Sequence, residues 1–101
     1  MEFMLTTTLR PSVTPEHNRE LLKVFSQWQP PEGATMKMLY IAADGQRSFG
    51  LFETDSAAAL AQITNTFADY LEFEVHPVLP AQEGASILGQ RHAWVDSVIQ
   101  G

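Results

Sequence analysis

Three polar side chains alternate along one segment in the second half of the chain. Glu72, Glu74 and His76 are spaced two residues apart in the run LEFEVHPV. Residues with this spacing point to the same face of an extended strand. A carboxylate beside an imidazole can tune it for general acid–base chemistry. The pattern makes His76 a candidate base oriented by Glu74. The simpler alternative is a strand face that is only solvated.

Other residues would complete such a site. Thr6 and Thr8 alternate in the same way near the start of the chain, and with Glu72 they would line a polar pocket. Tyr40 is the candidate hydrogen-bond donor of the site, and with Arg47 it would bind a carboxylate or a planar ligand. The alternative is that Tyr40 is a core or dimer contact and Arg47 a solvated charge.

We predict neither a metal site nor a bound cofactor. One histidine and two carboxylates form a conceivable ligand set, but Glu72, Glu74 and His76 share one strand. No second histidine is placed near them, because His17 falls in the first turn of a helix and His92 in a tail. The glycines form no phosphate-binding loop.

A β-hairpin from Thr35 to Thr54 must organise these residues. Asp44-Gly45 stands between two apolar runs and predicts a two-residue type I′ turn, which needs positive φ at both central residues. The register then sets Tyr40 opposite Phe49. One face carries Met36, Met38, Tyr40, Phe49 and Leu51, and the other carries Leu39, Ile41, Gly50 and Phe52, with Lys37 and Ser48. Since both faces are largely apolar, each needs a cover.

The segments around the hairpin complete a simple order of elements. A threonine-rich strand is expected over 2–9, and a last strand over 70–79, where Pro77 indicates a sheet edge or a bulge. A first helix begins at the Thr14 cap and ends near Gln29, and Asp55 or Ser56 caps a second. The first helix is expected to bury a stripe of four residues, Leu21, Leu22, Phe25 and Trp28.

The last twenty residues predict an extra helical tail. A weak helix over 81–90 is interrupted by Gly84 and Gly89. Beyond it, Trp94, Val95, Val98 and Ile99 form a short amphipathic segment. We expect 81–101 to be a helical extension packed on the domain 1–80 or on its partner.

The predicted order, strand, helix, strand, strand, helix, strand, is that of the α+β ferredoxin-like fold. Right-handed crossovers set both helices on one face of a four-stranded antiparallel sheet. The other face would then be exposed and partly apolar, which usually marks an interface or a ligand groove. We therefore expect a homodimer.

Composition narrows the classes of partner. The 101 residues carry a formal net charge of −6 and only six scattered basic residues, which argues against nucleic acid and anionic membrane surfaces. No run is long enough to span a membrane. The chain has no cysteine, which fits a reducing cytoplasm.

Three stretches, PPEGATMKMLYIAADGQ, GLFETDSAAAL and LEFEVHPVL, resemble a family of short bacterial proteins known as domain of unknown function 3303. The chain is also similar to the dimeric α/β-barrel superfamily. That resemblance implies two sheets paired face to face into a barrel. Some enzymes of the superfamily place an aromatic residue in the pocket, which makes Trp28 a candidate ligand contact; the alternative is packing in the core or at its rim. The family often carries Arg, Trp and His before the hairpin turn, where this chain has Leu39, Tyr40 and Ile41.

Three functions are compatible with these features. The first is an uncharacterised homodimeric barrel protein that holds a small apolar ligand in the barrel. The second is a cofactor-independent oxygenase or isomerase that uses His76, Glu74 and Tyr40. The third is a structural or protein-interaction module that uses the tail.

Overall fold

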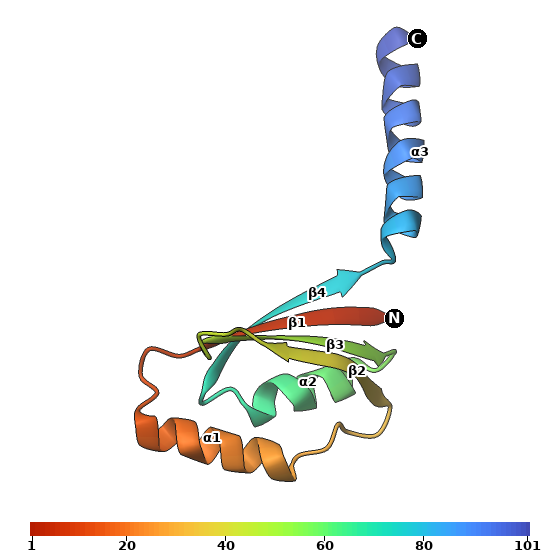
Figure 1. The fold of residues 1–101 in the computed structure, drawn as a ribbon. Coiled ribbons are helices and arrows are strands. Elements are labelled where there is room, and N and C mark those ends of the chain that lie inside the picture. The colour runs from red at the N-terminus through yellow and green to blue at the C-terminus, as the bar shows by residue number, and fades with distance from the viewer.

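The computed structural model describes residues 1–101 and contains four strands and three helices (Figure 1). In chain order they are β1 (Glu2–Leu9), α1 (Pro15–Gln27), β2 (Ala34–Ile41), β3 (Arg47–Thr54), α2 (Ala57–Thr66), β4 (Leu71–Val78) and α3 (Ala81–Gln100). The predicted ferredoxin-like order is confirmed, followed by a third helix. No helix combines the length and the apolar character that a membrane span requires.

The four strands form one antiparallel sheet in the order β2-β3-β1-β4. Helices α1 and α2 lie on one side of this sheet, and the other side, here called the open face, carries no helix (Figure 1). Strand β4 is an edge, so Pro77 needs no donor on its outer side, as its position in the sequence predicted.

Two predicted caps begin the helices that cover the sheet. The Thr14 hydroxyl accepts a hydrogen bond from the His17 backbone N–H at 3.2 Å, and Pro15 follows at the first helical position. Ser56, rather than Asp55, caps α2 and accepts from the Ala59 N–H at 3.1 Å. Local side-chain chemistry therefore fixes where both helices start.

The hairpin has the predicted register, with Tyr40 opposite Phe49 and Met38 opposite Leu51. The type I′ turn is wrong, because φ is positive only at Gly45 (74°) and at no residue other than glycine in this turn. Gly45 N–H donates instead to the Ala42 carbonyl at 2.8 Å, and the Asp44 carboxylate accepts from the Gln46 N–H at 2.9 Å. Asp44 thus stabilises the turn through its side chain, as aspartate often does.

A β-bulge interrupts β2 at Lys37. Met36 pairs with Phe52 and Met38 with Leu51, so Lys37 has no residue of its own opposite it. Met36 consequently lies on the helix side and packs against the core. Our assignment of Met36 to the same face as Met38 and Tyr40 is therefore wrong, because strict alternation does not hold across a bulge.

The core is small and lies between α2 and the centre of the sheet. Leu5, Phe52 and Ile63 are 2%, 5% and 2% exposed and form its centre. By contrast, no residue of α1 is buried. The predicted burial of the α1 stripe is therefore wrong: its side chains face the sheet but do not fill the space beneath the helix.

Helix α3 is one continuous helix of 20 residues. Its predicted interruption at Gly84 and Gly89 is wrong, because a glycine weakens a helix by about 1 kcal/mol without having to end it. The helix follows β4 after Leu79 and Pro80, and it extends away from its own sheet (Figure 1). It gives the molecule its elongated shape, 62 × 29 × 20 Å.

Candidate functional site

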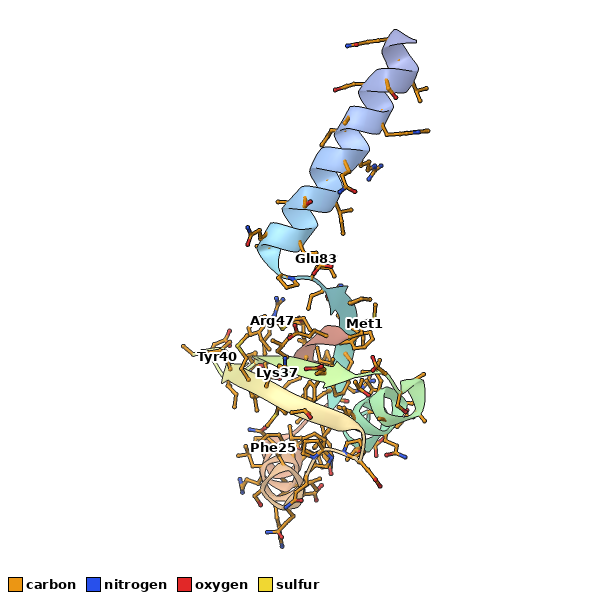
Figure 2. The ribbon with its side chains drawn as sticks, turned by 90° about the vertical axis from the view of Figure 1, so that its right-hand side faces the viewer. Met1, Phe25, Lys37, Tyr40, Arg47 and Glu83 are labelled. Atoms are coloured by element: carbon orange, nitrogen blue, oxygen red, sulfur yellow. The ribbon has the colours of Figure 1, made fainter.

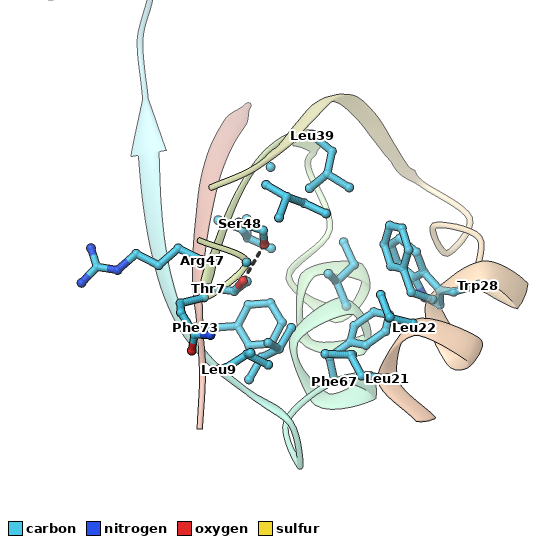
Figure 3. A pocket seen from close by; sticks show the side chains of 18 of the residues that line it. Thr7, Leu9, Leu21, Leu22, Trp28, Leu39, Arg47, Ser48, Phe67 and Phe73 are labelled. Carbon is cyan, nitrogen blue, oxygen red and sulfur yellow. Dashed lines mark hydrogen bonds between the residues drawn. The ribbon is translucent and has the colours of Figure 1, made fainter. Parts of the chain in front are cut away.

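A cavity of about 340 Å³ lies between α1 and the helix side of the sheet (Figure 3). Of its 21 lining residues, 14 are hydrophobic. Leu21 and Leu22 of α1 form one wall, and Leu39 and Phe73 come from opposite edges of the sheet. The space exists because the α1 side chains do not reach the sheet over the whole length of the helix.

Small side chains on the sheet make the floor of the cavity. Gly50 has no side chain and lies in the middle of β3, between Leu5 and Leu39 on the neighbouring strands. Next to it on the same face, the Thr7 and Ser48 hydroxyls are hydrogen-bonded to each other at 2.5 Å. A hydroxyl pair shares one proton, so the second proton remains free to reach a ligand.

Four aromatic rings surround the inner end of the cavity. Trp28 meets Phe67 edge-on with ring centroids 5.3 Å apart, and it meets Phe52 edge-on at 6.4 Å. Phe25 stacks on Trp28 at 6.1 Å and lies at the same distance from Phe67. Edge-to-face contacts of this kind hold rings in fixed relative positions. The inner wall is therefore both apolar and well defined.

Among the residues predicted to bind a ligand, Trp28 is in this cavity. Arg47 also borders it, but its side chain turns away from the apolar interior (Figure 3). Arg47 and Phe25 lie on opposite sides of the sheet (Figure 2). The interior is consequently free of charged side chains.

The other candidates lie on the open face, where strand pairing sets them in cross-strand rows. One row, from β2 to β4, is Tyr40, Phe49, Thr6 and Glu74. The next row is Met38, Leu51, Met4 and His76, and a third contains Arg47, Thr8 and Glu72. Rows of this kind bring side chains of neighbouring strands to within contact distance.

His76 contacts Glu74 in the structure but does not contact Tyr40. His76 Nε2 lies 3.3 Å from Glu74 Oε2. The two side chains are 57% and 74% exposed, so water screens their interaction. Tyr40 is on the opposite edge strand, β2. It is about 14 Å from Glu74, the residue of β4 in the same row, because three strand spacings separate them. Within the single chain, the three predicted catalytic residues do not form one site.

The charges on the open face are mostly paired. Lys37 Nζ lies 2.8 Å from a Glu53 carboxylate oxygen and 3.6 Å from one of Glu2. The hydrogen bond with Glu53 raises the pKa of Lys37, and the same bond lowers the pKa of the Glu53 carboxyl. Arg10 similarly approaches Glu72 at 3.8 Å. No group of three or more acidic or histidine side chains that could hold a metal ion is present.

Sequence reasoning missed Thr7, Ser48 and Gly50. One signal was available, because a glycine inside an apolar strand often marks a place where a ligand or another chain segment approaches closely. The two hydroxyl residues carry no such signal: only the pairing of β1 with β3 brings them together.

Comparison with known proteins places the chain in a family. The family model described as a domain of unknown function (DUF3303) matches residues 1–92. The chain belongs to this family. The match covers the whole sheet, α1, α2 and the first 12 of the 20 residues of α3. No curated protein and no solved structure matches the chain.

Proposed function

We propose that this member of the DUF3303 family is a homodimer that binds a small, uncharged, apolar molecule in the cavity beneath α1. The observation that carries the proposal is the cavity itself, about 340 Å³ with 14 hydrophobic residues among 21. Small-molecule sites usually have volumes of roughly 300–1,000 Å³, so this one suits a ligand of modest size. The sequence analysis had instead placed the ligand in the barrel, between two paired sheets.

The chemistry of the lining defines the class of ligand. Arg47 is its one charged residue, and that side chain points away from the interior. A buried charge without a partner is costly, so the cavity disfavours ions. The paired hydroxyls of Thr7 and Ser48 offer one polar contact, and the side-chain amides of Asn18 and Gln46 also line the cavity. A largely hydrocarbon or aromatic body with a small number of uncharged polar groups fits this arrangement.

The homodimer is proposed because of the open face. Met38, Tyr40 and Phe49 are 40%, 64% and 37% exposed there, beside Leu51 and Met4 in the same two rows. Fully burying one such side chain contributes roughly 1.5–3 kcal/mol. Two copies packed through this face would bury each other's apolar patch under two-fold symmetry.

A fluorescence titration tests the ligand site. The probe is N-phenyl-1-naphthylamine, an uncharged aromatic molecule whose emission rises in apolar surroundings. We expect saturable binding to the wild-type protein and at least a tenfold loss of affinity in Leu39→Trp, which fills the cavity. Leu79→Trp is the matched control, because Leu79 is 51% exposed and lies outside the cavity. Equal binding by both variants, or none by the wild type, would refute the proposal.

A second candidate function is acid–base catalysis by His76 and Glu74, which the 3.3 Å contact between them favours. Tyr40 would have to come from a second copy, packed so that its β2 faces β4. In that case Tyr40→Phe should shift the NMR signal of the His76 imidazole, but only at concentrations where the protein is dimeric. If the chemical shift of the His76 imidazole is unchanged by Tyr40→Phe at all protein concentrations, this composite site is ruled out.

A further inference from the structure

Helix α3 carries an apolar stripe along one side. Ile87, Leu88, Trp94, Val98 and Ile99 belong to it and are between 49% and 76% exposed. Val95 continues the stripe seven residues after Leu88, which is two helical turns. The opposite side is formed by Gln82, Ser86, Gln90, Ala93, Ser97 and Gln100. Arg91 also falls on the apolar side, four residues after Ile87 and four before Val95. The helix is therefore amphipathic, with one basic residue within the stripe, and its apolar side has no cover within the subunit.

A helix of this kind needs a packing partner. In proteins, most helical stability comes from burying an apolar face against other elements rather than from the intrinsic helix propensity of the residues. Gly84 and Gly89 weaken α3 further, by about 1 kcal/mol each relative to alanine. Its continuity over 20 residues thus implies a surface on which it rests.

Two candidate surfaces are disfavoured. Helices that lie on membranes are rich in lysine and arginine, whereas α3 has Arg91 as its sole basic residue and two acidic ones, Glu83 and Asp96. The helix side of its own sheet is also out of easy reach. Only Leu79 and Pro80 separate α3 from β4, and the helix points away from the sheet (Figure 1).

The cavity has an uncovered apolar rim. Leu22 and Ile41 line the cavity and are nevertheless 59% and 63% exposed. They mark the cavity mouth, where the interior meets solvent. Ile41 ends β2 at one edge of the sheet, whereas α3 leaves from β4 at the other edge. Helix α3 and Ile41 also lie at opposite ends of the strands, because Val78, the last residue of β4, pairs with Glu2 at the start of β1.

We infer that α3 crosses to a second copy of the chain and closes the mouth of that copy's cavity with its apolar stripe. Each copy has one exposed stripe and one exposed rim, so a reciprocal exchange covers all four surfaces under two-fold symmetry. A foreign partner bound to either surface would leave the other uncovered. This inference rests on the proposed function and adds that the ligand site is incomplete in a single subunit.

Paired full-length variants test the exchange. Leu88→Asp/Val95→Asp places two charges in the stripe. The control Ser86→Asp/Ala93→Asp places the same charges, seven residues apart, on the polar side. For the stripe variant we expect at least a tenfold weaker affinity for N-phenyl-1-naphthylamine, and a dimer dissociation constant raised at least tenfold in sedimentation equilibrium. The control should match the wild type in both measurements.

Coexpression decides whether the helix acts within one chain or between two. The stripe variant keeps its cavity, and Leu39→Trp keeps its helix. In mixed dimers the intact α3 of the Leu39→Trp chain covers the intact cavity of the stripe variant. Tight probe binding should therefore return at up to one site per dimer. Leu39→Phe replaces Leu39→Trp if the latter fails to fold. Closure within one chain would give no recovery, because neither subunit has both parts.

The outcomes separate this inference from the proposed function. If the wild type binds the probe, Leu39→Trp does not, and the stripe variant binds like its control, the ligand site stands and the exchange is refuted. Mixed dimers without recovered binding also refute it. If the wild type does not bind the probe at all, the proposed function fails, and a normal dimer dissociation constant in the stripe variant would then refute the exchange separately.

Discussion

Gly50→Ala should disturb the core and the cavity together. A Cβ atom at this position would lie 2.8 Å from Cε2 of Phe52 and 3.6 Å from Cδ1 of Leu39. The first distance is shorter than real Cβ contacts, so the Phe52 ring must move. This ring is only 5% exposed and is held edge-on against Trp28. The cavity beside it offers space into which the ring can shift, since Phe52 lines that cavity.

Two opposing effects set the size of the stability change. Overpacking a well-filled core costs roughly 1–3 kcal/mol. Replacing a glycine inside a strand recovers roughly 0.5–1 kcal/mol of conformational entropy. Because the Phe52 ring has room to move, we expect the net loss of folding stability to lie near the lower end of the overpacking range, about 1 kcal/mol. The displaced ring would also take volume from the cavity, so probe affinity should fall severalfold.

Urea unfolding followed by tryptophan fluorescence measures the first effect, because Trp28 contacts Phe52. A titration with N-phenyl-1-naphthylamine measures the second. Gly89→Ala is the matched control: no atom lies within 4 Å of a Cβ there, and the site is in α3, away from the cavity. A Gly50→Ala protein with undiminished stability and undiminished probe affinity would show that Phe52 is not packed against Gly50.

Three further predictions address the turn, the dimer and the paired charges. Gly45→Val should cost roughly 1–3 kcal/mol, because a β-branched residue is strained at the φ of 74° found there; an unchanged melting temperature would contradict the turn geometry. Met38→Asp should convert the proposed dimer to monomers near 11.3 kDa or to insoluble protein, and sedimentation velocity that still shows a dimer would place the interface elsewhere. Hydrogen bonding to Lys37 holds the pKa of Glu53 below its ordinary value of 4.5, so the pair stabilises the fold above pH 4.5 and loses this effect as the pH falls through the folded-state pKa. The unfolding free energy of the wild type minus that of Lys37→Met should therefore shrink in acid, and a difference that grows would refute this assignment.

The order of elements could be predicted because each depends on local signals. Thr14 and Ser56 cap helices through hydrogen bonds that span three residues. The hairpin register follows from a short turn between two apolar runs. The alternation of Glu74 and His76 correctly placed them in contact on one face. All of these are properties of short stretches of chain.

The remaining features depend on packing between distant segments. The bulge at Lys37 reverses the face of Met36, and no turn or spacing signal announces it. The cavity arises because α1 does not pack closely on the sheet above Gly50. The sequence of either segment alone does not indicate this spacing. The separation of Tyr40 from Glu74 depends on strand order. The pattern of α1 indicated which side faces the sheet but not how closely the helix approaches it.

The bulge also determines how β2 tolerates a change in length. Met36 faces the helices, Met38 the open face and Leu39 the helices again. Deleting Lys37 would join Met36 directly to Met38 and leave this alternation regular, with every other side chain on its present face. The direct loss would be the ion pairs of Lys37 with Glu53 and Glu2. Deleting a residue elsewhere in β2 would turn part of the strand over unless the bulge moved. Lys37 is therefore the position in β2 where sequences one residue shorter can keep the same sheet.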